Sequence, residues 1–158
     1  MKTAFTCLFL LVAVPLARAQ QSTPDKSPLA IEVSIVRDSL PRELFRRGGD
    51  FRVQTKITNI SGEKQTITVW SQPGWSWLAD SPLVHPDTNA NQNVSETRVL
   101  RPGEVYGEDV GMHFYPRDRK PVTFRLGFFP KAKLPVSGRP DAIPTDQIFW
   151  SNAVRLTP

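Results

Sequence analysis

Apolar and polar side chains alternate along most of the chain after residue 28, which is the pattern of β-strands with one buried face. The clearest example is the run 51–58, where Phe51, Val53 and Ile57 alternate with polar side chains. The same period recurs in the runs 31–35, 66–69, 110–114, 122–128 and 148–156, and a weaker run lies at 94–100. No run shows a convincing helical period. The pattern therefore predicts an all-β domain of about seven strands.

Prolines and turn residues punctuate these runs, because proline cannot donate to a β-ladder. The prolines at or outside the ends of the runs are Pro28, Pro41, Pro73, Pro102, Pro116, Pro121 and Pro130. Residues 101–104 place Pro and Gly at the central positions of a type II turn, and residues 59–64 contain the Ser-Gly pair of a short hairpin. We expect both turns to join antiparallel strands, in an antiparallel two-sheet sandwich with Trp150 in its core.

The first residues have the features of an export signal. Lys2 precedes an apolar run from Ala4 to Leu16, and the small residues at 17–19 fit a signal peptidase site. The run is shorter than the roughly 20 apolar residues that cross a membrane. We therefore expect a signal peptide at 1–19, a short flexible segment at 20–28 and one domain at 29–158. The mature chain would be periplasmic or extracellular, with no membrane span.

Composition and charge exclude several classes of function. The single cysteine, Cys7, lies in the leader, so the mature domain has neither a disulfide nor a thiolate site. Loss of Lys2 and Arg18 lowers the basic count from 20 to 18 against 15 acids, so the net charge falls from +5 to +3. The nearest approach to a basic cluster is Arg42, Arg46 and Arg47, which Glu43 interrupts. We interpret it as a solvated loop and expect no binding of nucleic acid.

Catalytic and metal-binding patterns are scarce. His85 and His113 are the only imidazoles, and the chain has no Gly-x-Ser-x-Gly motif and no phosphate-binding glycine loop. We therefore expect no enzymatic activity and no cofactor. Oxygen ligands occur at every second position in Asp87, Asn89, Asn91 and Asn93, as in a calcium loop, but Gln92 and Arg98 stand where such a loop needs glycine and a bidentate acid. A turn-rich loop whose Asn side chains bond to the backbone is the interpretation we favour.

Two segments resemble a known family. The run 57–69, followed by Val99-Leu100-Arg101-Pro102-Gly103-Glu104, resembles the strand, hairpin and Leu-x-Pro-Gly-Glu signature of bacterial extracellular immunoglobulin-like domains. The resemblance implies an immunoglobulin-like sandwich, and its members include adhesive modules, accessory domains and proteinase inhibitors of the BsuPI type. Some relatives carry a cysteine pair around residues 75–91, and this chain lacks it.

The loop from Gln72 to Asn93 is the candidate recognition site. Trp75 and Trp77 would share a face if the segment is extended, and would form a platform for a sugar or a protein if exposed. Alternatively, they cap the open end of the sandwich. The candidate binding residues are Trp75, Trp77, Asp80, His85, Asp87, Asn89 and Asn91. We expect a secreted, non-catalytic binding module for a glycan or protein at the cell surface or in the periplasm. Alternatives are an extracellular protease inhibitor of the BsuPI type or an assembly domain of the envelope with an exposed edge strand.

Overall fold

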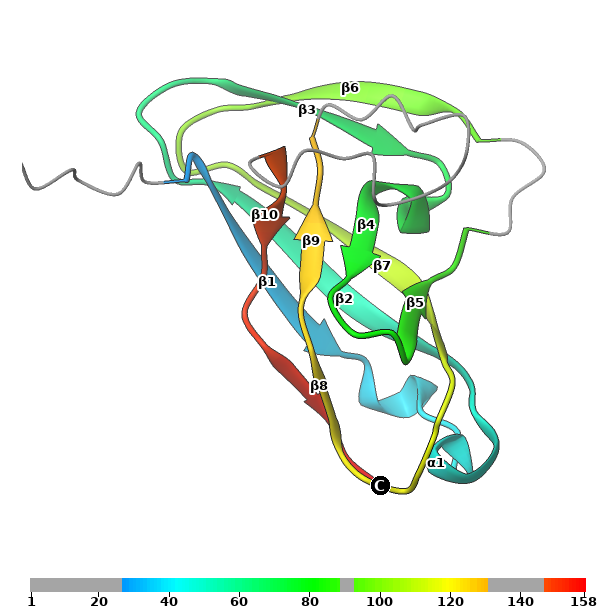
Figure 1. Cartoon of the computed structure of the whole chain (residues 1–158). Helices are drawn as coiled ribbons and strands as arrows, with labels where there is room; N and C mark the ends of the chain where they lie inside the picture. Colours follow the sequence, from blue (N-terminus) through cyan, green and yellow to red (C-terminus); the bar gives the residue numbers. More distant parts are fainter. Residues whose placement is uncertain (1–26, 89–92, 131–146) are drawn as a thin grey trace, which may run out of the picture.

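Eleven β-strands make up most of the described part of the chain, residues 27–88, 93–130 and 147–158 of a computed structural model (Figure 1). The strands are β1 (Leu29–Ile35), β2 (Gly49–Asn59), β3 (Gln65–Trp70), β4 (Trp77–Ala79), β5 (Val84–Pro86), β6 (Ser95–Leu100), β7 (Val105–Phe114), β8 (Val122–Phe124), β9 (Leu126–Phe128), β10 (Phe149–Trp150) and β11 (Val154–Leu156). Helical segments are short: η1 (Arg37–Ser39), α1 (Leu44–Arg47) and η2 (Pro73–Ser76). The predicted all-β class is confirmed. The predicted signal peptide lies outside the described residues.

Each run with a period of two forms strand structure. In β2, every second residue from Phe51 to Asn59 is buried, while the residues between are exposed or half-buried. The last two predicted runs are each divided: Arg125 separates β8 from β9, and residues 151–153 separate β10 from β11. β4 and β5 lie where the pattern predicted only a loop, because strands of three residues are too short to show a period.

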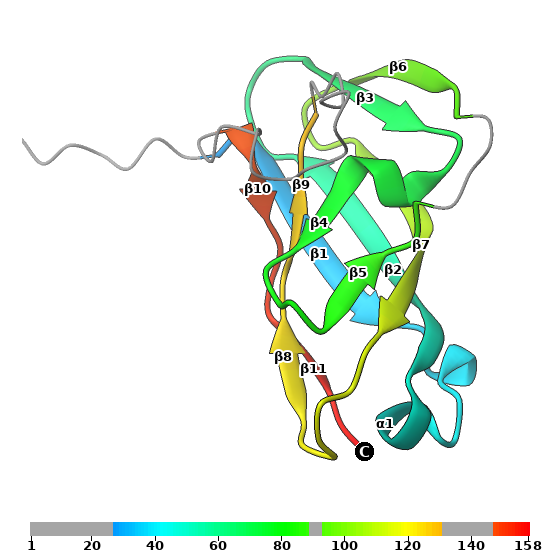
Figure 2. The same cartoon turned by 45° about the vertical axis from the view of Figure 1, so that its right-hand side comes forward.

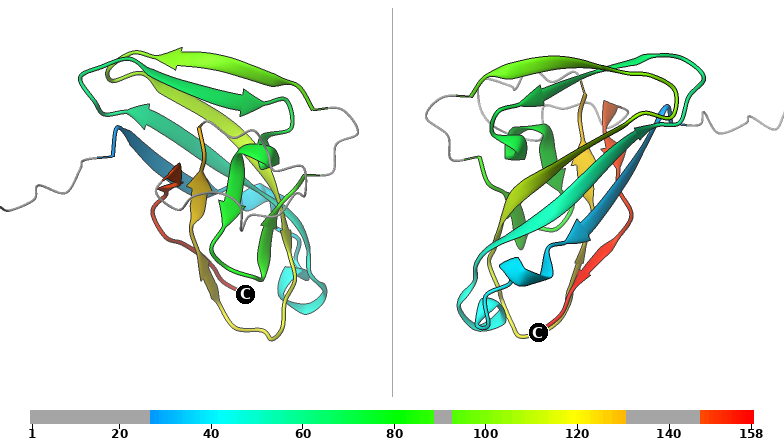
Figure 3. Two further views of the ribbon diagram at one scale, coloured as in Figure 1. Left: turned by 45° about the horizontal axis from the view of Figure 1, so that its top comes forward. Right: turned by 180° about the vertical axis from the view of Figure 1, so that it is seen from behind.

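The strands form a sandwich-like arrangement. β1, β2, β7 and β5 make a four-stranded antiparallel sheet in the order β1-β2-β7-β5, while the sheet β10-β9-β4 and the pair β11-β8 lie across one of its faces (Figures 1 and 2). The ring of Phe51 from β2 meets that of Phe124 from β8 edge-on, with centroids 6.3 Å apart. The remaining pair, β3 with β6, lies at one end of the molecule (Figure 3). No helix among the described residues is long and apolar enough to cross a membrane.

The core draws on all of these sheets. Its largest fully buried apolar side chains are Phe51, Phe114, Phe124, Phe128, Ile57, Ile67, Met112, Leu126, Leu156, Val53, Val84 and Val110. Burying one side chain of this size stabilises a fold by about 1.5–3 kcal/mol. Because the described residues contain no cysteine, this packing and the backbone ladders hold them together without a disulfide.

The predicted hairpin at residues 59–64 is a crossing between sheets, so the hairpin is wrong, and the predicted type II turn at residues 101–104 also joins two strands that do not pair with each other. β2 pairs with β1 and β7, whereas β3 pairs with β6. Residues 101–104 do form the predicted turn: Gly103 has a φ of 79°, and the Glu104 N–H donates to the Arg101 carbonyl at 2.9 Å. The fully buried Asn59 ties both corners together, because its Nδ2 donates to the carbonyls of Glu63 at 2.7 Å and Leu100 at 2.9 Å. A buried amide that links both corners holds the crossing in place.

Trp150 is half-buried, which corrects the prediction that it lies in the core. Its ring covers Gly127, where a Cβ would come within 3.1 Å of it, and the guanidinium of Arg125 lies 5.1 Å from the ring centroid. The predicted alternation of buried and exposed side chains from Ile148 onward is interrupted at residues 151–153, between β10 and β11. There the hydroxyl of the buried Ser151 accepts a hydrogen bond from the Leu126 N–H. The apolar ring therefore covers the outside of the glycine and stacks against a cation.

Candidate functional site

The segment from residue 72 to residue 93, called the 72–93 loop below, is built into the sheets on both sides. After η2, β4 pairs with β9, with Trp77 opposite Phe128. β5 then pairs with β7, with His85 opposite His113. The described part of the loop is therefore held along its length by backbone ladders.

The two candidate tryptophans have different environments. Trp77 is 3% exposed; its Nε1 donates to Glu108 Oε1 at 2.8 Å, and its ring lies 5.1 Å from that of Phe128. Trp75 is half-buried, its Nε1 donates to the Thr88 carbonyl at 2.9 Å, and its ring lies 6.1 Å from that of Trp70. Residues 73–76 form a 3-10 turn, so the segment is not extended and a platform of Trp75 with Trp77 does not form. Trp75 instead pairs with Trp70.

The ends of the 72–93 loop are fastened together. Gly74 lies against the backbone of Asp87 so closely that a Cβ would sit 1.8 Å from the Asp87 carbonyl oxygen. The Asn93 Oδ1 accepts hydrogen bonds from the Gln72 N–H at 3.0 Å and the Ser71 hydroxyl at 3.1 Å. The bond from the Gln72 N–H joins Asn93 to backbone 21 residues away, so it is not the local Asn-to-backbone bonding expected for a turn-rich loop. Asn89 and Asn91 lie outside the described residues.

Asp80 and His85 have local partners. The carboxylate of Asp80 accepts from the Arg125 backbone N–H at 2.7 Å and from its Nε at 2.9 Å, at the break between β8 and β9. His85 is exposed, and its Nε2 lies 3.0 Å from the Pro82 carbonyl oxygen. Asp80 therefore fixes the chain path of two strands, while His85 presents its ring at the surface.

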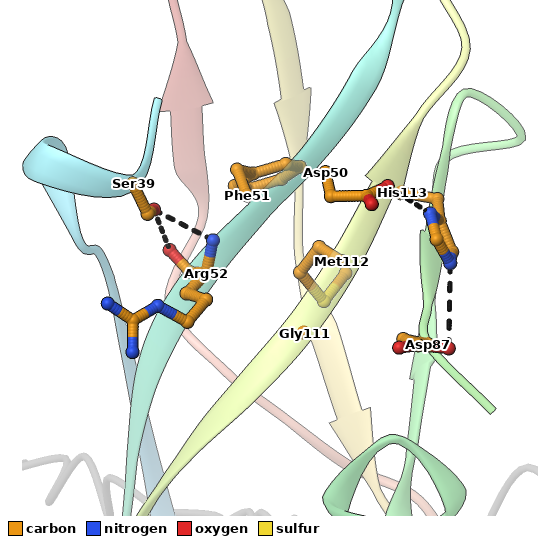
Figure 4. A pocket seen from close by; sticks show the side chains of 8 residues that line it. All are labelled: Ser39, Asp50, Phe51, Arg52, Asp87, Gly111, Met112 and His113. Atoms are coloured by element: carbon orange, nitrogen blue, oxygen red, sulfur yellow. Dashed lines mark hydrogen bonds and ion pairs between the residues drawn. The ribbon is translucent and has the colours of Figure 1, made fainter. Parts of the chain in front are cut away.

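Asp87 belongs to a cluster that the sequence did not predict. The ring of His113 lies between two carboxylates: Nδ1 contacts Asp50 Oδ1, and Nε2 lies 3.5 Å from Asp87 Oδ1 (Figure 4). These residues line an open pocket of about 280 Å³ together with Ser39, Arg52 and others. The Ser39 hydroxyl donates to the Val36 carbonyl at 2.6 Å and accepts from the Arg52 N–H at 2.8 Å, so it ties η1 to β2. Sixty-three residues separate Asp50 from His113, and only the pairing of β2 with β7 joins them.

The side chains of Asp50, Asp87 and His113 do not form a metal site. Within the described residues, no group of three or more His, Cys, Asp or Glu side chains is arranged to hold a metal ion. The two carboxylates meet opposite nitrogens of one imidazole, so they do not converge on a common point. The contacts of the His113 ring with Asp50 and Asp87 therefore join β2, β7 and the 72–93 loop.

The half-buried carboxylate of Glu108 joins the loop to β7. Its Oε1 accepts from Trp77 and its Oε2 accepts from the Tyr106 hydroxyl at 2.8 Å. Burial raises the pKa of the Glu108 carboxyl above its usual range, and the hydrogen bonds from Trp77 and Tyr106 oppose that shift only in part. Burial and the bond to Glu108 likewise raise the pKa of the Tyr106 hydroxyl. The guanidinium of Arg98 lies 5.1 Å from the Tyr106 ring centroid.

The outer edge of β6 is exposed and pairs with no described strand. β3 pairs with β6 on one side, and no described strand pairs with it on the other (Figures 1 and 3). Its residues from Ser95 to Val99 are all exposed. Most exposed large apolar side chains of the described residues lie in or beside this strand and its adjoining turns: Ile60 at 56%, Val94 at 69%, Val99 at 53% and Val105 at 54%. The sequence predicted a strand at residues 94–100 but not an edge, because apolar and polar residues scarcely alternate in this run. Polar side chains on both faces are nevertheless expected of a strand that covers little of the core.

Every second residue of β6 directs its backbone N–H and C=O groups away from β3, toward the edge with which no described strand pairs. The Thr68 N–H in β3 donates to the Pro130 carbonyl at 2.8 Å, on the side of β3 away from β6. Thr68 and its Cα partner Thr97 therefore exchange no backbone hydrogen bonds. Because directions alternate along a strand, Ser95, Thr97 and Val99 turn their N–H and C=O groups away from β3.

Comparisons with known proteins give one structural likeness. No family model matches the chain, and no curated protein matches it. The crystal structure of a FixG-related protein from Vibrio parahaemolyticus is similar, with a TM-score of 0.45 and 13% sequence identity over 83% of this chain and 96% of that chain. A likeness at this level carries no statement about function.

Proposed function

We propose that the protein is an exported, non-catalytic binding module with an immunoglobulin-like two-sheet sandwich, and that it binds polypeptide by adding a partner strand to β6. The observation that carries this proposal is the outer edge of β6, with which no described strand pairs and toward which Ser95, Thr97 and Val99 direct their backbone groups. Strand addition satisfies such groups through main-chain hydrogen bonds. Strand addition is also how an assembly domain with an exposed edge strand, one of the alternatives from the sequence, would bind its partner.

The composition of β6 supports this proposal. Exposed edges in soluble proteins are commonly blocked by charged side chains, lysine above all, by proline, by a bulge or by a covering segment. The strand sequence of β6, Ser-Glu-Thr-Arg-Val-Leu, contains neither proline nor lysine, and its two charged side chains, Glu96 and Arg98, are of opposite sign and pair with each other at 2.9 Å. Exposed Val94, Val99 and Val105 border the edge, and apolar side chains that gather on a surface mark an interaction site.

The test blocks the edge without removing a bond of the fold. Thr97→Pro removes an N–H that points away from β3, and proline is tolerated at such edge positions. Thr97→Val is the matched control, because it changes the side chain and keeps the N–H. We expect linear peptides selected from a display library on the wild-type protein to bind Thr97→Val equally and Thr97→Pro at least about tenfold more weakly. Peptides that bind Thr97→Pro as well as the wild type would refute strand addition.

The 72–93 loop is a second candidate surface, for a glycan or a protein. The observation in its favour is the pair of half-buried rings of Trp70 and Trp75, with centroids 6.1 Å apart. Such a pair offers a face on which a sugar ring can stack. A glycan array separates the two surfaces. Glycan binding at the 72–93 loop should be lost in Trp75→Ala and kept in Thr97→Pro. If no glycan on the array binds the wild-type protein, the glycan part of the proposal is refuted.

A further inference from the structure

We propose that the strand added to β6 is β6 of a second copy of this chain, so that two molecules form a symmetric antiparallel dimer through this edge. The inference rests on the proposed function, because it names the partner that strand addition leaves open. Three features of the edge support it: the outward backbone groups, the order of the charges and the exposed apolar side chains beside them.

The outward backbone groups fit a two-fold axis at Thr97. With that axis, Thr97 lies opposite Thr97 of the second copy, and Ser95 lies opposite Val99. All three residues direct their N–H and C=O groups away from β3. Residues opposed in this way exchange both of their backbone hydrogen bonds in an antiparallel ladder. The register therefore satisfies every outward group from Ser95 to Val99.

The same register pairs opposite charges. Glu96 of each copy lies opposite Arg98 of the other, at positions where the backbones exchange no bonds across the new edge and side chains approach most closely. In the single chain, Arg98 Nη2 meets Glu96 Oε2 at 2.9 Å, with side chains 45% and 61% exposed. Both charges thus share one accessible face and can form the equivalent contact across the axis.

Neighbouring registers oppose like charges. The outward residues must face outward residues, so the register changes in steps that move the axis by one residue. An axis at Glu96 sets the two copies of Glu96 against each other, and an axis at Arg98 does the same for Arg98. Like charges directly opposite in a sheet are destabilising. The sequence of β6 therefore specifies one antiparallel register for self-pairing.

Exposed apolar side chains lie next to this edge. Val94 and Val99 lie within or next to the paired segment, and Val105 follows the turn after β6. One added strand together with these few valine side chains makes a small interface, and small interfaces are typical of weak and reversible association. We expect dimerisation that depends on protein concentration.

Charge exchange between the two positions tests the dimer. Sedimentation velocity of the purified wild-type protein over a concentration series should show a monomer–dimer equilibrium. Glu96→Arg and Arg98→Glu each oppose like charges in the homodimer, so each should raise the dissociation constant at least about tenfold. An equimolar mixture of the two variants should recover the dimer, because the mixed pair again opposes opposite charges at both positions. Thr97→Pro should abolish the dimer in every background.

Several results would overturn the inference. They are a wild-type protein that stays monomeric at all concentrations, a Glu96→Arg dimer of unchanged strength, or a mixture that stays monomeric. If Arg98→Glu does not fold, a salt series on Glu96→Arg replaces the mixture: added salt should strengthen this variant's dimer and weaken that of the wild type, and the opposite trend refutes the pairing. A monomeric wild type that still binds selected peptides, and loses them in Thr97→Pro, would refute the dimer and leave the proposed function intact.

Discussion

Asn152 takes the place of a strand partner for Val33. The Val33 N–H donates to Asn152 Oδ1 at 2.8 Å, and Asn152 Nδ2 donates to the Val33 carbonyl at 3.1 Å. One side-chain amide thus supplies the two bonds that a neighbouring strand would give, at the outer edge of β1. This edge is occupied where β10 leads into β11, whereas the edge of β6 has no such cover in the described chain.

We expect Asn152→Ala to destabilise the protein by about 1–3 kcal/mol, because it removes both bonds and leaves a backbone donor and acceptor of β1 without this partner. Urea denaturation followed by circular dichroism measures the change. Ser34→Ala is the control on the same strand, since Ser34 is exposed, and it should change the free energy of unfolding by less than about 0.5 kcal/mol. Equal effects of the two substitutions would show that the amide does not substitute for a strand.

Glu108→Gln should change how stability depends on pH. The folded protein raises the pKa of the Glu108 carboxyl from 4.5, so the fold favours the protonated form. Stability from this group is fully present at low pH and is lost as pH rises through the raised pKa. A glutamine stays neutral and still accepts from Trp77. We therefore expect the free energy of unfolding of Glu108→Gln, relative to wild type, to increase with pH above about 4.5 and then level off.

The measurement is a set of urea titrations at several pH values. Glu32→Gln is the matched control, because it makes the same substitution at an exposed position of β1. If Glu108→Gln falls below wild type as pH rises, the fold favours the carboxylate and the proposed cause is wrong.

Gly74→Ala should detach the 72–93 loop or strain it severely. The added Cβ would lie 1.8 Å from the Asp87 carbonyl oxygen and 3.2 Å from the Asp87 nitrogen, and neither backbone atom can turn aside as a side chain does. We expect a loss of about 3 kcal/mol or more. Gly62→Ala is the control: a Cβ there has no atom within 4 Å, so its effect should be within about 0.5 kcal/mol. Thermal unfolding measures both, and similar melting temperatures would contradict the close approach.

Replacing Trp75 and Trp77 by phenylalanine should separate their roles. Trp77→Phe replaces a buried indole with a smaller phenyl ring and removes the donor to Glu108, so we expect a loss of about 2–4 kcal/mol. Trp75→Phe makes the same change at a half-buried position and removes the hydrogen bond to Thr88, which costs about 1 kcal/mol. Acrylamide quenching of tryptophan fluorescence gives a second readout: the quenchable fraction should fall in Trp75→Phe and not in Trp77→Phe. The reverse order would place Trp77 at the surface.

The sequence by itself determined where the longer strands form. In β2, alternation over residues 51–58 places Phe51, Val53 and Ile57 on one face, and a period of two leaves no other arrangement that buries them together. Pro102 and Gly103 likewise specify a turn through local backbone geometry, and that turn is present. These features depend on residues close in the chain, so the sequence contains the information that predicts them.

The tertiary structure decided which strands pair and which polar groups meet. The predicted hairpin at residues 59–64 and the turn at residues 101–104 are both crossings between sheets, because the partner of a strand depends on how whole sheets pack. Asn59 binds the two corners only after they meet. The cluster of Asp50, Asp87 and His113, the burial of Trp77 and the free edge of β6 arise in the same way. Each joins segments far apart in the sequence, or leaves one segment without a neighbour. Such contacts are fixed by the geometry of the assembled sheets, which no local pattern contains.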